Sequence, residues 1–349
     1  MSAQAADSRW MRRALSLAKR AWGRTSPNPM VGSVVVQKDR EVGAGYHHQA
    51  GQPHAEVNAL RDAGSAARDA DVFVTLEPCC THGRTPPCTE ALIEAGARRV
   101  VIGCLDPNPA HAGRAVTILQ EAGIEVVSGV QEQSCQELNE AFFHWIQTGR
   151  PFVLLKMAMT LDGKIATAGG DSKWVTGPKA RAHVQRLRRW ADAIMVGGET
   201  VRVDNPSLTV RTPEDWPCQP RKLVWSRRID FDRRLNVWAD PANPPRFAAP
   251  DGSESWQDFL AELGTQGVTA LLIEGGGELA SACLRAGFVD KVAFFIAPKI
   301  LGGRGSRPVV AGPNPDALMD AFGVDQLKVR HVGPDILLTG YVNHVHRTN

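Results

Sequence analysis

The amino-acid sequence predicts an α/β protein of two domains, and three observations lead to this prediction. The chain has 349 residues, and at roughly 150 residues per domain this length suggests about two domains. Short β-rich runs alternate with helical segments in both halves, a pattern typical of mostly parallel sheets covered by helices. Thr148-Gly149-Arg150-Pro151 places a helix-ending glycine and a proline between the halves. We therefore expect domains at residues 1–149 and 150–349.

The composition excludes several other classes of protein. Apolar residues make up 43% and charged residues 22%, which is ordinary globular usage and excludes a disordered or collagen-like chain. The 40 Lys and Arg residues nearly balance the 37 Asp and Glu residues, so no overall field favours nucleic acid or a membrane surface. No apolar run reaches the roughly 18 residues of a membrane span. The seven cysteines cannot all pair, which suits a reducing compartment, and we expect a cytoplasmic protein.

The first half is expected to open with an amphipathic helix. One helical face collects Trp10, Met11, Ala14, Leu15, Ala18, Ala21 and Trp22. Asp7 or Ser8 stands in the N-cap position of this helix. The basic residues off that face would also suit an organelle transit peptide, but the first helix of a domain is the preferred interpretation.

Strands and helices then alternate to the end of the first half. Val31–Gln37 and Glu41–Tyr46 are β-rich runs that form a hairpin across Lys38-Asp39-Arg40. The further expected elements are strands Asp71–Glu77, Arg99–Leu105 and Ile124–Val130, and helices His54–Ala63, Thr89–Ala97, Gly113–Ala122 and Glu132–Gln147.

The second half repeats this organisation. A Pro-rich stretch from Pro241 to Pro250 is expected to be a surface loop. Three glycines, Gly275 to Gly277, connect a strand to a helix. The expected elements are strands Phe152–Met159, Ala193–Val196, Lys222–Ser226, Thr269–Ile273, Val289–Ile296 and Asp335–Val342, and helices Pro178–Trp190 and Glu278–Ala286.

His54, Cys79 and Cys88 form a candidate zinc site. One imidazole and two thiolates hold the metal and leave a fourth position for a water that the metal acidifies. Glu56, two residues after the histidine, would carry the proton from this water to a leaving amine. A histidine, a glutamate two residues later and a following Pro-Cys are typical of deaminases that act on nucleobases.

The spacing of the cysteines departs from the usual deaminase signature. Eight residues separate Cys79 from Cys88 instead of two, so Cys80 and His82 are also nominal ligands. Cys79 and Cys88 are preferred, because adjacent cysteines seldom reach one ion in a tight turn. The alternative is a closed structural zinc site with four protein ligands, which would have no use for Glu56.

Several motifs of the first half resemble the bifunctional deaminase–reductase family of riboflavin biosynthesis. They are Asn28-Pro-Met-Val-Gly32, His54-Ala-Glu56, Thr75-Leu-Glu-Pro-Cys-Cys-Thr-His-Gly-Arg-Thr-Pro-Pro-Cys88 and Asp106-Pro-Asn-Pro109. The resemblance implies a cytidine-deaminase-like α/β/α sandwich that hydrolyses the ring amine of 2,5-diamino-6-ribosylamino-4(3H)-pyrimidinone 5′-phosphate. It also implies substrate contacts from Asn28, His47, Arg84, Asp106 and Asn108. Turn formation alone would equally explain Asn28 and the segment Asp106-Pro107-Asn108.

The resemblance continues through the second half. The motifs, in the order typical of the family's reductase domain, are Lys156–Ala166, Ser172–Val175, Asp204–Pro206, Leu208–Arg211 and Glu274–Gly277. They imply a dihydrofolate-reductase-like α/β fold, a homodimer, and NADPH as cofactor. The implied NADPH contacts are Ala158, Trp174, Thr200, Asp204, Ser226, Gly276, Gly277, Glu278, Leu279, Ala280, Ser281 and Ala282. The implied substrate contacts are Ser172, Arg188, Leu208, Arg211 and Glu274.

The chemistry of these residues agrees with reduction of a sugar phosphate. Arg188 and Arg211 can supply the cations for the phosphate, and a glycine-rich helix start can face a diphosphate. Nothing in the second half requires an acid–base residue, because the cofactor carries out the hydride transfer. Two plainer interpretations are a solvated helix face for Arg188 and core packing for Trp174.

The sequence thus predicts an enzyme with two activities. Zinc-assisted deamination of the pyrimidine ribotide would precede NADPH-dependent reduction to 5-amino-6-(5-phosphoribitylamino)uracil. One alternative is a nucleic-acid base deaminase with an accessory domain, which would need a basic groove and stacking aromatic residues. The other is a zinc-stabilised binding module, in which Glu56 would have no chemical role.

Overall fold

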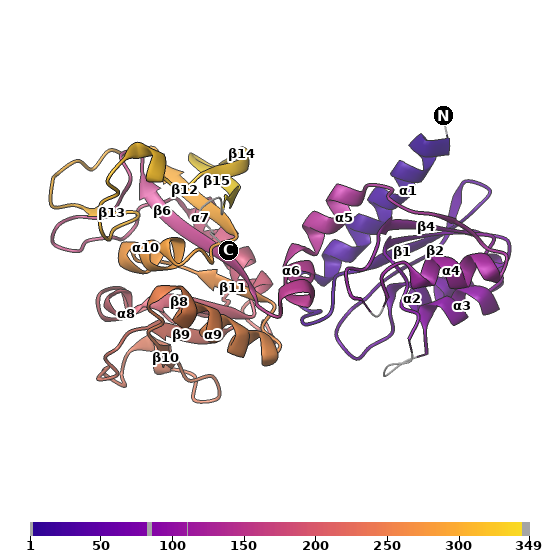
Figure 1. Ribbon diagram of the computed structural model, residues 1–349, viewed down its shortest axis with the longest axis horizontal. Helices are drawn as coiled ribbons and strands as arrows, with labels where there is room; N and C mark the ends of the chain where they lie inside the picture. The colour runs from indigo at the N-terminus through magenta and orange to yellow at the C-terminus, as the bar shows by residue number, and fades with distance from the viewer. Residues whose placement is uncertain (1–2, 82–85, 110, 344–349) are drawn as a thin grey trace. The chain divides into compact units, whose positions relative to one another are not determined.

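The computed structural model describes residues 3–81, 86–109 and 111–343. The chain divides into two compact units, Met1–Gly149 and Arg150–Asn349. Each unit is built on one large sheet that has helices on both faces (Figure 1). None of the helices in the described ranges is both long and apolar enough to cross a membrane.

The first unit holds a five-stranded sheet in the order β2-β1-β3-β4-β5. β1 pairs with β2 and β3 antiparallel, whereas β3, β4 and β5 run parallel. The elements of this unit are α1 (Ala3–Ala18), β1 (Gly32–Gln37), β2 (Arg40–Tyr46), α2 (Ala55–Ala63), β3 (Asp71–Leu76), α3 (Cys88–Glu94), β4 (Arg99–Cys104), α4 (Arg114–Glu121), β5 (Glu125–Val127), α5 (Glu132–Leu138) and α6 (Glu140–Thr148).

Alternation of buried side chains gives this sheet two apolar faces. Val34 and Phe73 face the apolar side of α1, while Val35 and Val74 face α2, α3 and α4. The helix α2 lies close to β2 because β2 has a glycine at the contact. A Cβ atom on Gly45 would lie 2.4 Å from the amide nitrogen of Ala59 in α2. Since His54 and Glu56 are at the start of α2, this contact also positions them.

The helix α1 confirms the expected apolar face but begins earlier than predicted. Six of the seven residues of that face are buried: Trp10, Met11, Ala14, Leu15, Ala18 and Ala21. The helix starts at Ala3, so neither Asp7 nor Ser8 is its N-cap. Asp7 is instead buried within the helix, where its carboxylate accepts hydrogen bonds of 2.9 and 2.7 Å from Arg99 of β4. A local capping rule missed this long-range ion pair.

The single helix expected at Glu132–Gln147 is divided into α5 and α6 at Asn139. The buried side-chain amide of Asn139 pairs with the backbone of Met30, accepting from its N–H at 2.8 Å and donating to its carbonyl at 2.9 Å. Asn139 also has non-helical dihedral angles, φ −116° and ψ 24°. Pairing with Met30, just before the distant strand β1, therefore accompanies the end of one helix and the start of the next.

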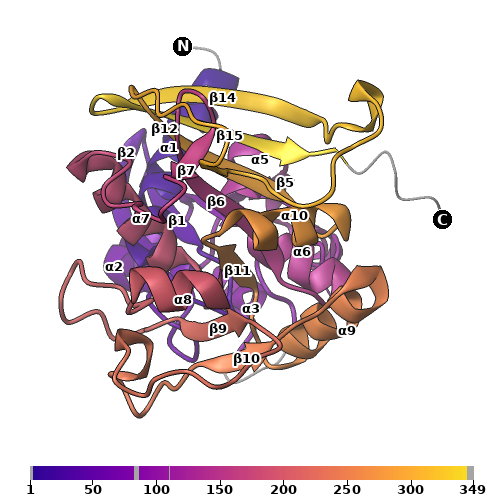
Figure 2. The same ribbon diagram turned by 90° about the vertical axis from the view of Figure 1, so that its left-hand side faces the viewer.

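The second unit holds an eight-stranded sheet in the order β10-β9-β8-β11-β6-β12-β15-β14, with β14 at one edge (Figure 2). The strands from β10 to β12 run parallel, and β15 and β14 are antiparallel additions. The elements are β6 (Phe152–Thr160), β7 (Lys164–Ala166), α7 (Pro178–Trp190), β8 (Ala193–Gly197), α8 (Gly198–Asp204), β9 (Arg221–Trp225), β10 (Arg246–Ala248), α9 (Gly252–Thr265), β11 (Ala270–Ile273), α10 (Gly277–Arg285), β12 (Lys291–Ala297), β13 (Arg307–Pro308), β14 (Val324–Val332) and β15 (Asp335–Val342).

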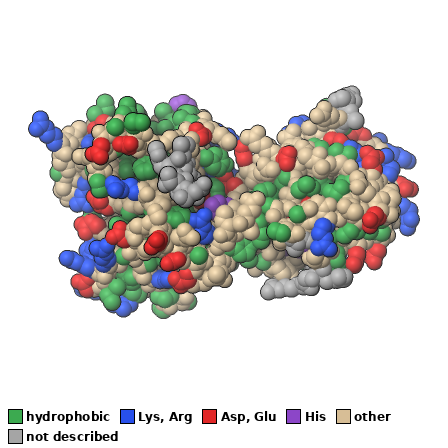
Figure 3. All heavy atoms as spheres, viewed as in Figure 1, with side chains coloured by type: hydrophobic (Ala, Val, Ile, Leu, Met, Phe, Trp, Pro, Cys, Tyr) green, Lys and Arg blue, Asp and Glu red, His purple; other side chains and the backbone are tan. Residues whose placement is uncertain are grey.

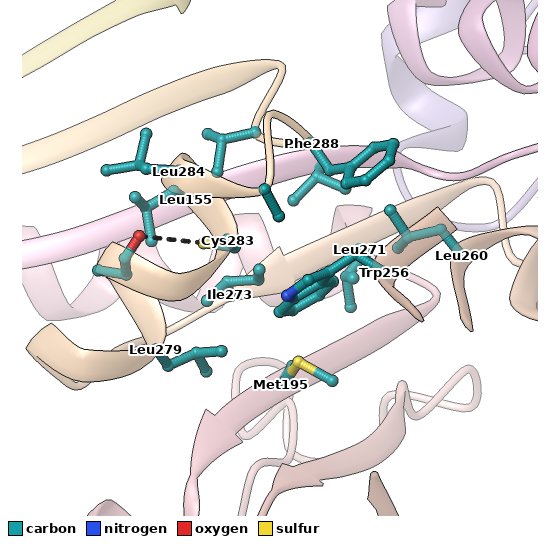
Figure 4. Close-up of a cluster of buried hydrophobic side chains, with 14 of the residues drawn as sticks. Leu155, Met195, Trp256, Leu260, Leu271, Ile273, Leu279, Cys283, Leu284 and Phe288 are labelled. Carbon is teal, nitrogen blue, oxygen red and sulfur yellow. Dashed lines mark hydrogen bonds between the residues drawn. The ribbon is translucent and has the colours of Figure 1, made fainter. Parts of the chain in front are cut away.

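Two hydrophobic clusters cover the faces of this sheet. Trp256 of α9 and Leu279 of α10 pack with Leu155, Met195 and Ile273 of the strands (Figure 4). On the opposite face, α7 packs through Ala180 and neighbouring side chains against a second set of strand residues. The parallel strands between these helices are buried on both faces, which explains their nearly continuous apolar sequences.

Two expectations for the second unit were incomplete. The stretch from Pro241 to Pro250 is not only a loop, because Arg246–Ala248 pairs with Leu223–Trp225 as the edge strand β10. The sequence patterns also gave no indication of α8, α9 or β14. The side chains of β14 are exposed over almost its whole length, so hydrophobic alternation could not reveal this strand.

The pairing of Asn139 with Met30 leads to a stability prediction. Asn139→Ala should lower the free energy of unfolding of the first unit by about 2–4 kcal/mol, because two buried backbone groups of Met30 lose their partners. Urea denaturation followed by circular dichroism measures the change. Gln133→Ala is the matched control, since it removes an exposed amide that donates to Glu137. An equal effect of the two substitutions would contradict the role given to Asn139.

Candidate active sites

Three side chains with metal-binding atoms converge in the first unit. His54 directly precedes α2, Cys79 follows β3, and Cys88 is the first residue of α3. The Nδ1 atom of His54 lies 3.3 Å from Sγ of Cys88 and 3.5 Å from Sγ of Cys79. The three ligand atoms all lie within 4.8 Å of one another. Nitrogen and thiolate ligands in this number suit zinc and leave one coordination position open.

The electrostatics of Cys79 favour a bound cation. The pKa of Cys79 is lowered to about 4, chiefly by a hydrogen bond from the Cys88 side chain and also by His54. The same interaction raises the pKa of Cys88, which holds the shared proton. The backbone N–H of Cys88 additionally donates to Sγ of Cys79 at 3.3 Å. The site therefore stabilises negative charge on sulfur, as a thiolate–metal centre requires.

Glu56 lies beside this cluster and is buried, with 3% of its surface exposed. The pKa of Glu56 is raised to about 7, chiefly by burial and also by the nearby Cys79, while His54 and a hydrogen bond with Cys88 act in the opposite direction. A carboxyl group with a pKa near neutrality can both accept and release a proton, as an acid–base catalyst must.

His47 and Asn28 lie next to the same cluster. The ring of His47 meets the ring of His54 edge to face, with centroids 5.3 Å apart. Its Nδ1 atom lies 3.2 Å from the carbonyl of Pro53, and its Nε2 atom lies 3.1 Å from Nδ2 of Asn28. Nδ1 therefore donates and Nε2 accepts, which describes a neutral imidazole. Burial lowers the pKa of His47, which favours this neutral form.

Asp106 and Asn108 follow β4, which is paired with the strand β3 that leads to Cys79. Oδ1 of Asp106 accepts a hydrogen bond of 2.8 Å from the backbone of Asn108, so this segment does form a turn. Burial raises the pKa of Asp106. Arg84, the remaining expected substrate contact of this unit, lies outside the described residues, as does His82.

Glu77 is a buried residue of this site that the sequence analysis did not single out. Its carboxylate accepts backbone hydrogen bonds from Asp106 at 3.1 Å, Gly113 at 2.9 Å and Ala115 at 3.1 Å. These bonds join the end of β3 to the loop after β4 and to the start of α4. A glutamate directly after an apolar strand and before Pro78-Cys79 was the available signal.

Cys80 is not among the three converging ligand residues. Its Sγ atom lies 3.5 Å from Nδ1 of His111, and among the described residues the metal-binding group contains only His54, Cys79 and Cys88. The preference for Cys79 and Cys88 over Cys80 thus agrees with the geometry.

A cavity of about 1280 Å³ lies in the second unit, at the carboxyl ends of its parallel strands. Most of the expected cofactor and substrate contacts line it, namely Ala158, Ser172, Trp174, Arg188, Thr200, Asp204, Leu208, Arg211, Ser226, Glu274, Gly276, Gly277, Glu278, Leu279, Ser281 and Ala282. Ala280 does not line it, because this residue faces the hydrophobic core and has no exposed surface. The expected contacts from Gly276 to Ala282 lie mostly on a helix, α10, and one face of this helix is turned to the core. Ala280 is on that face and is therefore not a cavity residue.

Arg188 is not a freely available phosphate ligand. Its Nε and Nη2 atoms donate to the two oxygens of Glu274 at 2.7 and 2.9 Å, and Nη1 donates to the carbonyl of Thr209 at 2.9 Å. Burial acts to raise the pKa of Glu274, but Arg188, helped by Lys156 and Arg211, lowers it to about 2. The solvated helix face considered for Arg188 is therefore wrong, since the residue is buried in an ion pair.

Lys156 is a second residue of this site that the sequence analysis did not single out. Its side chain lines the cavity, and burial lowers its pKa while Glu274 opposes the shift. The strand β6 carries Lys156 and Ala158 on the same side, two residues apart. A lysine inside an otherwise apolar strand was the available signal.

The remaining residues connect the rim of the cavity. The hydroxyl of Ser172 donates to Asp204 at 2.7 Å, which joins an expected substrate contact to an expected cofactor contact. Trp174 is 62% exposed, so core packing is wrong for this residue, and the guanidinium of Arg181 lies 4.6 Å from its ring centre. A Cβ atom on Gly276 would lie 3.5 Å from the hydroxyl of Thr200.

Two family models match the chain. The model of the cytidine and deoxycytidylate deaminase zinc-binding region matches residues 4–104, and the model of the RibD C-terminal domain matches residues 151–338. The first match contains His54, Glu56 and Cys79 together with Cys88, and the second contains nearly all of the cavity described above.

Relatives that extend over almost the whole chain contain both regions. The riboflavin biosynthesis protein RibD of Synechocystis sp. is 43% identical over 96% of this chain and 96% of its own length. The RibD of Escherichia coli is 40% identical over 95% of this chain and 98% of its own length.

Solved structures agree. Acinetobacter baumannii RibD matches with a TM-score of 0.89 and 38% identity, over 97% of this chain and 99% of that one. A Thermotoga maritima diaminohydroxyphosphoribosylaminopyrimidine deaminase/5-amino-6-(5-phosphoribosylamino)uracil reductase matches with a TM-score of 0.88 and 35% identity, over 98% of this chain and 100% of that one. The expected fold class is confirmed, and the chain belongs to the RibD family of bifunctional deaminases and reductases of riboflavin biosynthesis.

Proposed function

We propose that the first unit deaminates 2,5-diamino-6-ribosylamino-4(3H)-pyrimidinone 5′-phosphate with His54, Cys79 and Cys88 as zinc ligands. The observation that carries this proposal is the convergence of these three side chains beside the buried carboxyl group of Glu56. Zinc, when bound, supplies a Lewis acid that makes a water nucleophilic at neutral pH. Glu56 accepts a proton from the attacking water and delivers it to the leaving amine.

The groups around Glu56 suit the recognition of a pyrimidine. Asn28 and the neutral His47 present a hydrogen-bonded pair beside His54, and Asp106 and Asn108 come from the adjacent loop. Amide and carboxylate groups of this kind can read the polar edge of a pyrimidine ring. We assign Arg84 to the substrate phosphate on the strength of the family resemblance alone.

For the second unit we propose NADPH-dependent reduction of the ribosyl side chain in the large cavity. The N-terminus of α10 presents backbone N–H groups to the cavity at Gly276 and Gly277, where a diphosphate is favoured by the helix dipole. Of the two arginines expected at the substrate phosphate, Arg211 is the one we assign to it, since Arg188 is paired with Glu274. That ion pair in turn positions Glu274 at the cavity wall, close enough to Lys156 for their charges to interact.

The nucleic-acid alternative is less well supported than a small-molecule substrate. On the face drawn in Figure 3, the Lys and Arg side chains of the described residues are interspersed with Asp and Glu and form no continuous basic surface. A nucleic-acid base deaminase needs such a surface to bind the phosphate backbone.

We also propose a homodimer in which the edge strand β14 meets β14 of a second copy. Leu327 and Val329 on this strand are 56% and 61% exposed, and Leu318 and Met319 just before it are 91% and 84% exposed. Exposed edge strands with apolar side chains favour pairing with another chain. When two identical edge strands meet across a two-fold axis, each supplies hydrogen-bond partners for the unpaired backbone groups of the other.

A reducing compartment such as the cytoplasm is our proposal for the working environment. All seven cysteines are free thiols, and Cys79 and Cys88 must stay reduced to hold a metal. Oxidation of the protein should therefore release zinc.

A product assay tests both proposed reactions. The zinc-loaded protein is incubated with the diaminopyrimidine ribotide, first without and then with NADPH. The masses of the products are measured by mass spectrometry. We expect exchange of an amine for an oxo group without NADPH and a gain of two hydrogens with it. Absence of both changes in folded, metal-loaded protein would overturn the proposed substrate.

Glu56→Gln should lower the deamination rate at least about 100-fold, because the substituted amide cannot carry a proton. Zinc content, measured by atomic absorption, and reduction of the already deaminated substrate should be unchanged. Glu94→Gln, an exposed glutamate on α3, is the control. Full deaminase activity in the Glu56 variant would remove this residue from the mechanism.

Arg211→Gln should raise the KM of the reductase for its ribotide about ten- to hundredfold, because a charged hydrogen bond to the phosphate is lost. The affinity for NADPH should stay the same. Arg304→Gln replaces an exposed arginine that does not line the cavity and serves as control. A KM unchanged by the Arg211 substitution would show that the phosphate binds elsewhere.

Leu327→Lys combined with Val329→Lys should shift the protein from dimer to monomer, because the added charges repel across a two-fold axis. Analytical ultracentrifugation measures the change. Ile229→Lys, at a residue that is 72% exposed and distant in sequence from β14, should leave the dimer intact. A dimer that resists the double substitution would place the interface on another surface.

A further inference from the structure

Three neighbouring parallel strands lead into one side of the large cavity. In the order β9-β8-β11, the first leads to Ser226 and Arg227, the second to α8, and the third to the glycines before α10. Strands about 4.8 Å apart place the end of β9 roughly 10 Å from the end of β11. The ion pair between Arg188 and Glu274 belongs to the other part of the cavity wall, on the side of α7. The end of β9 is thus separated from Arg188 and Glu274, the pair that is expected to face the substrate.

Close packing positions α8 beside the end of β9. A Cβ atom on Gly198, the first residue of α8, would lie 2.9 Å from Oγ of Ser226 and 3.1 Å from the ring of Phe231. Ser226 is itself held in a turn, because its hydroxyl accepts the backbone N–H of Arg228 at 3.1 Å. The first turn of α8 therefore packs directly against Ser226 and Phe231, because residue 198 is a glycine and has no side chain.

Two arginines flank Ser226 in the cavity wall, Arg202 from α8 and Arg227 from the end of β9. The guanidinium of Arg202 stacks 4.3 Å from the ring centre of Phe231 and has only a long ion pair, 3.8 Å, with the exposed Asp230. Arg227 contacts Asp251 through Nη2 at 2.6 Å, and both of these side chains are mostly exposed. Each guanidinium keeps N–H groups for a further anion.

We propose that Arg202 and Arg227 bind the 2′-phosphate of NADPH and thereby make the reductase select NADPH over NADH. The inference rests on the proposed reductase function and adds the residues that decide the cofactor. The proposal assigns the diphosphate to the start of α10 and the adenosine ribose to the side of α8 and β9, where these arginines line the cavity. Planar guanidinium groups match the oxygens of a phosphate monoester, which carries close to two negative charges near neutral pH.

The carboxylate of Asp251 would by itself favour NADH over NADPH. An acidic group in such a position can accept a hydrogen bond from the 2′-hydroxyl of NADH. In this protein Asp251 is paired with Arg227, which reduces its repulsion of a phosphate. Asp230, the other carboxylate near these arginines, is 80% exposed and lies 3.8 Å from Arg202. Both arginines therefore keep N–H groups that can bind the phosphate.

Equilibrium titration of the full-length protein with NADPH and with NADH, followed by cofactor fluorescence, tests this proposal. The variants are Arg202→Gln, Arg227→Gln and their combination. Arg228→Gln is the matched control, since Arg228 is adjacent in sequence but does not line the cavity. Each single substitution should weaken NADPH binding about ten- to hundredfold and leave NADH binding unchanged. Added salt should weaken NADPH binding to the wild type more than to the double variant.

The outcomes separate this inference from the proposed function. If the wild type binds NADPH and the double variant keeps the same preference for NADPH over NADH, only the assignment of Arg202 and Arg227 is overturned. A wild-type preference for NADH would overturn it in favour of Asp251. Failure of the wild type to bind either cofactor would overturn the proposed reductase function itself. Unchanged NADH binding also shows that each variant is folded.

Discussion

Both sites depend on one constraint, that parallel strands end together at the same edge of a sheet. In the first unit β3 and β4 lead to the Cys79 and Asp106 segments, and in the second unit β6, β8, β9 and β11 surround the cavity. Polar groups gathered at such an edge are partly withdrawn from water, so each needs a partner within the protein. The partner that each group finds decides whether it is structural or remains available for chemistry.

Three buried glutamates show this difference. Glu77 accepts three backbone N–H groups and is thereby committed to holding loops together. Glu274 is paired with Arg188, which keeps its pKa near 2 despite burial. Among the described residues no ion pair of this kind holds Glu56, and its pKa is raised to about 7, chiefly by burial. Only the last of these environments suits a group that must gain and lose a proton.

Under the proposed function, the second unit recognises its two ligands at different parts of one cavity wall. The pair of Arg188 and Glu274, with Lys156 nearby, occupies the part of the wall beside α7 and β6. The N-terminus of α10 and the arginines at the end of β9 occupy the part toward the open edge of the sheet. In the proposed reduction, one cavity would hold both ligands and bring the hydride donor to the ribosyl carbon, so the protein would contribute mainly by positioning them.

The sequence by itself determined the elements with strong local signals and the residues that belong to compact motifs. The apolar runs of β6 and β11 and the amphipathic face of α1 were predictable because burial imposes a period on the sequence. His54, Glu56, Cys79 and Cys88 were predictable because their chemistry requires a fixed set of residue types. Only the tertiary structure decided the roles of Asp7, Asn139, Glu77, Arg188 and Lys156. Their partners Arg99, Met30, Asp106 and Glu274 are distant in the chain, and no local pattern encodes contacts that form when separate strands and helices pack together.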